Sequence, residues 1–297
     1  MDTIHAGMDH FCQVAMTGYT AAMPTMTKDE VISHLSRYTG SFPREAVKAA
    51  QEIWDEIADD MLAALRHAAD NPVELVEDTG ASLHTYAMYL CAEKRETRAL
   101  DPFLRMMSYS DQRTLDVLLG DTLTEAGGRI IASLFAGDLQ PIYQLVENRD
   151  AYDLSRGQAV RSLSVLVANG ALERDTVIAY LRELFEGRIE REPSAVWNEV
   201  AEAAAALAGG ELHSEVEQAF EDELVDFLFD VPESILADVD RDVDLLSGSE
   251  VRFEKSNRRS AATLRVRAGA AASTKNAAVG KRGGENYHTL AHRRAPR

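Results

Sequence analysis

The feature that most constrains this chain is a helical apolar period that continues through its middle almost without interruption. Apolar residues recur at positions i, i+3, i+4 and i+7, which places them on one face of an α-helix. Three of the clearest stripes are Leu83, Tyr86, Ala87, Leu90 and Cys91; Leu100, Phe103, Leu104 and Met107; and Val177, Ile178, Leu181, Leu184 and Phe185. No comparable strand pattern accompanies them, so the sequence predicts an all-α fold.

Residues that favour helix ends agree with these stripes. Thr27 with Glu30 and Ser214 with Glu217 have the spacing of capping boxes, in which two side chains satisfy free amides of the first turn. Proline suits a first turn and glycine suits a helix end, and such residues are Pro43, Pro141, Pro193, Gly137, Gly170, Gly187 and Gly209. We expect one long helix from Pro43 to about Ala69, whose inward residues are Ile53, Trp54, Ile57, Met61, Leu62 and Leu65.

The predicted helices also occur in pairs. Segments that begin near Ala81, Gly120, Asp153 and Ser194 each contain a longer helix, a short turn and a second helix, at spacings of 39, 33 and 41 residues. A repeat of this length, built from two antiparallel helices, is typical of HEAT-like α-α superhelices (solenoids). We therefore expect a HEAT-like superhelix. Because the repeats are degenerate, an irregular all-α bundle is the alternative.

Charge divides the chain into two unequal parts. Residues 251–297 contain twelve Lys and Arg against two Glu, whereas residues 1–250 contain 19 Lys and Arg against 47 Asp and Glu. The basic part has few aromatic residues and many Ala, Gly and Ser, so it buries too little apolar surface to offset the entropy of ordering. We expect a flexible N-terminal extension at 1–27, a helical domain at 28–245 and a disordered basic tail at 246–297.

The sequence indicates a cytoplasmic protein. No stretch approaches the roughly 18 consecutive apolar residues of a membrane-spanning helix, and the N-terminus lacks the pattern of a secretory signal. The two cysteines, Cys12 and Cys91, are far apart in the sequence, and we expect both to be free thiols.

Several segments resemble one bacterial family. They are residues 38–43 (YTGSFP), 83–90 (LHTYAMYL), 119–125 (LGDTLTE) and the region 179–197, and together they resemble domain-of-unknown-function family 1186 over residues 28–240. The resemblance implies a HEAT-like helical domain and no established activity. Some members carry a small cysteine-rich zinc motif, which this chain lacks because no cysteine follows Cys91.

The candidate site residues are Asp121, Glu125 and His84. Asp121 and Glu125 stand four residues apart at a predicted helix start, where two carboxylates can bind a divalent cation or transfer protons. The structural alternative is that they cap the helix and interact with its dipole. His84 lies beside an apolar stripe without a second histidine at metal-ligand spacing, so an ordinary packing or groove role is the alternative to chemistry.

The sequence contains neither a phosphate-binding loop nor a nucleophile elbow, and we expect no cofactor and no metal. The acidic body is expected to repel nucleic acid, although the basic tail can contact polyanions or the protein's own acidic surface. We therefore expect a non-catalytic interaction or scaffold module with a protein or peptide partner. The alternatives are an enzyme or metal-dependent protein that uses Asp121 and Glu125, and polyanion binding through the tail.

Overall fold

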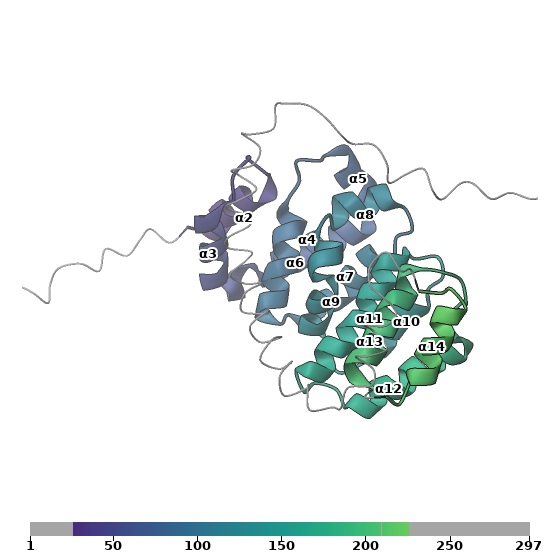
Figure 1. The fold of residues 1–297 in the computed structure, drawn as a ribbon. Helices are drawn as coiled ribbons and strands as arrows, with labels where there is room; N and C mark the ends of the chain where they lie inside the picture. Colours follow the sequence, from purple (N-terminus) through teal and green to yellow (C-terminus); the bar gives the residue numbers. More distant parts are fainter. Residues whose placement is uncertain (1–25, 209, 226–297) are drawn as a thin grey trace, which may run out of the picture.

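A computed structural model describes residues 26–208 and 210–225, and every regular element in these residues is helical (Figure 1). The predicted basic tail, Gly209 and nearly all of the predicted N-terminal extension lie outside the described residues. The α-helices are α2 (Lys28–Ser36), α3 (Arg44–Glu52), α4 (Trp54–Asp70), α5 (Pro72–Glu77), α6 (Leu83–Lys94), α7 (Leu100–Met107), α8 (Gln112–Leu118), α9 (Thr122–Leu134), α10 (Gln140–Glu147), α11 (Asp153–Ala168), α12 (Arg174–Glu183), α13 (Ala195–Leu207) and α14 (His213–Glu221). A 3-10 turn, η1 (Thr97–Ala99), and a π-helical turn, η2 (Leu184–Arg188), complete them. The prediction of an all-α fold is confirmed for this part of the chain.

Four helices stack side by side in chain order, and we call them the long-helix row: α6, α9, α11 and α13 (Figure 1). Each begins within two residues of a predicted repeat start. A shorter helix follows each member, namely α7, α10, α12 and α14, and α8 is an additional helix before α9. One hydrophobic cluster extends from Val31 to Val225 through all of these helices. The predicted domain boundaries at residues 28 and 245 stay predictions.

The contact between α9 and α11 is unusually close because two glycines of α9 face α11. A methyl group built on Gly128 would lie only 2.9 Å from the main-chain oxygen of Gln158. The amide of Gly128 donates a 3.0 Å hydrogen bond to the side-chain oxygen of Gln158. Gly127 also leaves room for the side chain of Gln158. The pair of glycines therefore serves close helix packing.

The prediction of one long helix from Pro43 to Ala69 is wrong, because the chain turns at Ile53 (φ −101°, ψ 28°). The turn separates two helices with different partners: α3 packs mainly on α2, and α4 packs on α6 and α7. Ile53 and Trp54 are consequently only half-buried. The other predicted inward residues of this segment, Ile57, Met61, Leu62 and Leu65, are fully buried.

Of the two predicted capping boxes, one is confirmed. The Thr27 amide donates to the Glu30 carboxylate at 2.8 Å, and the Glu30 amide donates back to the Thr27 hydroxyl. The box at Ser214 is wrong because α14 already begins at His213, after a tight turn. Ser214 thus lies inside the first turn, where its hydroxyl donates to Glu215.

No helix in the described residues is long and apolar enough to cross a membrane.

Candidate functional site

The predicted carboxylates Asp121 and Glu125 lie at the start of α9, and both are exposed. Asp121 occupies the N-cap position, but its side chain makes no capping hydrogen bond; its main-chain oxygen accepts from the Glu125 amide at 2.9 Å. Over the residues that the structure describes, no group of three His, Cys, Asp or Glu side chains is arranged to hold a metal.

His84 lies in a different environment, buried on α6 with 4% of its surface exposed. Its ring lies near main-chain groups of Val117 and Leu118 at the end of α8, and its Nε2 lies 3.5 Å from the hydroxyl of Thr85. Burial lowers the pKa of His84, which these main-chain groups only partly counteract, and neither predicted carboxylate contributes to the shift. His84 is therefore an interior residue of α6, and catalysis by His84, Asp121 and Glu125 stays a prediction.

A continuous row of polar residues crosses the long-helix row, and we call it the polar strip: Tyr89 of α6, Thr122, Glu125 and Arg129 of α9, Arg161 of α11, and Glu199 and Glu202 of α13. Tyr89 and Thr122 share a 2.9 Å hydrogen bond between α6 and α9. Nη1 of Arg161 lies 3.3 Å from Oε1 of Glu199, which joins α11 to α13. The strip thus contains Glu125 but not His84.

Ionisation along the polar strip is perturbed, chiefly by burial. Burial lowers the pKa of Arg129, and the like charge of Arg161 lowers it further. Burial raises the pKa of Glu199 to about 7; Arg161 opposes this shift and Glu202 adds to it. Burial also raises the pKa of Tyr89, with smaller contributions from Glu125 and Asp121. Perturbed ionisable groups that lie close together are candidates for a functional role.

Sequence reasoning missed Arg129, Arg161 and Glu199 as site residues. The available signal was Arg161, which interrupts an otherwise largely apolar run at 159–167 (AVRSLSVLV). Its partners stand 32 residues earlier and 38 residues later, so only the packing of α9, α11 and α13 brings the three together.

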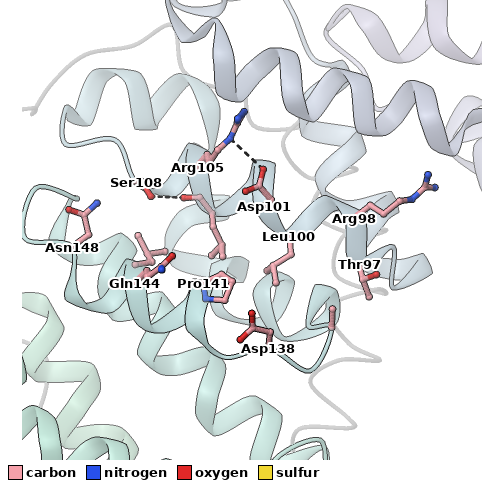
Figure 2. A pocket seen from close by; sticks show the side chains of 13 residues that line it. Thr97, Arg98, Leu100, Asp101, Arg105, Ser108, Asp138, Pro141, Gln144 and Asn148 are labelled. Atoms are coloured by element: carbon pink, nitrogen blue, oxygen red, sulfur yellow. Dashed lines mark hydrogen bonds and ion pairs between the residues drawn. The ribbon is translucent and has the colours of Figure 1, made fainter.

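A separate groove of about 480 Å³ lies between α7 and α10, and Figure 2 shows its lining. Leu100 and Pro141 provide apolar walls. Arg105 is engaged by carboxylates: its Nη2 lies 2.5 Å from Oδ1 of Asp70, and its Nε lies 3.6 Å from Oδ2 of Asp101. None of the three predicted site residues lines this groove.

The thiol of Cys91 is free and buried in α6. Burial raises its pKa to about 12, so it stays protonated and poorly nucleophilic at neutral pH. Cys12 lies outside the described residues.

Comparison with known proteins confirms the resemblance noted in the sequence. The model of the family described as "Protein of unknown function (DUF1186)" matches residues 26–257. An uncharacterized protein of Chlamydia trachomatis serovar D is 34% identical over 205 residues, which cover 69% of this chain and 81% of the relative. An uncharacterized protein of Chlamydia muridarum is 33% identical over 204 residues, with the same coverage of 69% and 81%. No solved structure matches the chain. Because the family model spans well over half of the sequence, the chain belongs to the DUF1186 family.

Proposed function

We propose that this protein is a non-catalytic interaction module, built as a HEAT-like superhelix, that presents the polar strip to a protein or peptide partner. The ordered packing of the long-helix row supports this arrangement, since α9 contacts α6 and α11, and α11 contacts α9 and α13. Helical repeats of this kind present extended faces on which a partner lies across several helices.

The observation that carries the proposal is the continuity of the polar strip. Its charged and hydroxyl groups extend over four helices and interact across the helix boundaries. A catalytic site instead needs a few groups that converge on one reacting atom, and the strip residues do not line the groove between α7 and α10. A surface that is spread in this way favours recognition of an extended partner.

The charge balance favours a protein or peptide over nucleic acid as the partner. Residues 26–225 contain 18 Lys and Arg against 37 Asp and Glu. Such an excess of acid repels a phosphate backbone, whose binding depends on many cationic contacts.

The test is affinity capture from native lysate with three forms of the full chain: wild type, a strip variant and a control. The strip variant is Arg161→Glu with Glu202→Lys, and the control is Arg113→Glu on α8 with Glu217→Lys on α14; all four residues are exposed. We expect one discrete protein to be retained by wild type and control and lost by the strip variant. Equal retention by all three forms, or retention of polyanions alone that high salt abolishes, would contradict the proposal.

A further inference from the structure

We propose that Arg129 and Arg161 form a binding subsite for a single carboxylate group, supplied by an acidic side chain or the C-terminus of a bound peptide. The subsite rests on the proposed function, because it names the group of the partner that the polar strip recognises.

Helix packing places the two arginines together. Gly128, which precedes Arg129, faces α11 so closely that a methyl group built on it would lie 3.2 Å from Cβ of Arg161. The two side chains therefore leave adjacent points of α9 and α11. Burial lowers the pKa of Arg129 most, and repulsion by Arg161 lowers it further. An anion bound between two neighbouring guanidinium groups relieves this repulsion.

Arg129 retains donors for a ligand. Its guanidinium donates to the main-chain oxygen of Glu125, and it forms no salt bridge with a carboxylate of any described residue. Arg129 is half-buried, so a hydrogen bond from it to an anion is less weakened by water than one on an open surface.

Arg161 is accessible, and its ion pair with Glu199 neutralises its positive charge only in part. Its side chain is 51% exposed. Glu199 is its carboxylate partner, at 3.3 Å, but near neutral pH a large part of Glu199 is protonated and carries no charge. Part of the positive charge of Arg161 is therefore available to an external anion.

The surroundings favour a monoanion. Glu125 and Glu202 lie in the same strip, and the described residues as a whole are strongly acidic. A second negative charge on the ligand would meet these carboxylates, whereas one carboxylate matches the forked donors of arginine. This distinguishes a peptide carboxylate from a dianionic phosphate or sulfate ester.

The test is a titration of the isotopically labelled full chain with sodium acetate at pH 6.5, followed by NMR of the arginine Nε–Hε groups. Sodium chloride holds the ionic strength constant, and sodium sulfate serves as the dianionic comparison. We expect the signals of Arg129 and Arg161, assigned with Arg129→Lys and Arg161→Lys, to shift saturably with acetate. The signal of Arg113, an exposed arginine on α8, should follow the chloride control.

In Arg161→Gln, acetate binding at Arg129 should weaken about tenfold or more, because one charge-assisted donor is lost. Arg113→Gln should leave the affinity for acetate at Arg129 unchanged. Shifts that are linear, shared by all arginines, or stronger with sulfate than with acetate would overturn the subsite. The two proposals can also fail separately. If acetate binds saturably but the captured protein is retained equally by wild type and the strip variant, the subsite stands and the proposed function is rejected.

Discussion

Glu199 is the strip residue whose ionisation opposes folding. Its pKa rises from 4.5 to about 7 in the folded chain, so the folded state binds its proton more tightly than the unfolded state does. The associated stability is present at low pH and is lost as the pH rises from about 4.5 to about 7. We expect Glu199→Gln, which mimics the protonated form, to stabilise the protein at pH 8 by up to about 3 kcal/mol and to have little effect at pH 4.5.

Urea unfolding of the wild type and of Glu199→Gln, at pH 8 and at pH 4.5, measures the change in the free energy of unfolding. Glu217→Gln on α14 is the matched control, since Glu217 is exposed. An equal stability change at both pH values would show that the effect of Glu199→Gln comes from packing rather than ionisation.

Arg156 is buried near the start of α11 and pairs with Glu190; the two side chains are 3% and 15% exposed. Its Nε also donates to the main-chain oxygen of Val146 at 2.8 Å. We expect Arg156→Leu to destabilise the protein by about 3 kcal/mol, because it leaves a poorly hydrated carboxylate and a carbonyl without their donor.

The matched comparison is Arg149→Leu, which removes an exposed ion pair with Glu192 and should change stability by less than about 1 kcal/mol. Urea denaturation of both variants is the measurement. If the two losses were equal, burial of the Arg156 pair would not be the cause.

At the scale of helices, the close approach of α9 and α11 depends on Gly128. Alanine is a better helix former than glycine by about 1 kcal/mol, yet we expect Gly128→Ala to destabilise the protein by about 1–3 kcal/mol. The new methyl group would lie 2.9 Å from a main-chain oxygen, so the helices must separate. The free energy of unfolding, measured by urea denaturation, tests this.

Gly127→Ala is the paired control, because the three atoms nearest to a methyl group there all belong to side chains, at 3.2, 3.3 and 3.4 Å. These atoms belong to Gln158 and Met107, which can move, so a nearly neutral change is expected. If Gly127→Ala destabilised the protein more than Gly128→Ala, the closest contact between α9 and α11 would lie at Gly127 and not at Gly128.

The sequence was most informative about features that depend on residues close to one another along the chain. The starts of α6, α9, α11 and α13 follow from apolar period and boundary residues, and the Thr27 box follows from local spacing. The break at Ile53 was missed because the residues on both sides are compatible with a helix, and only the different partners of α3 and α4 require a turn. The polar strip was missed for the same reason: it is made by contacts between helices.

At the scale of the whole molecule, the stacking of helices in chain order predicts uneven stability. Helix α11 packs on α9, α10, α12 and α13, whereas α14 packs chiefly on α13. In arrays whose elements contact mainly their neighbours, the ends open before the centre. We therefore expect native-state hydrogen exchange to show the strongest protection in α11, at amides such as those of Val160 and Leu163, and much weaker protection in α14.

Mass spectrometry of peptides from α11 and α14 measures this gradient. Glu199→Gln is expected to raise the protection of amides around α13 at pH 8. Uniform protection from α2 to α14 would indicate a single cooperative bundle, the alternative to a superhelix, because such a bundle opens only as a whole.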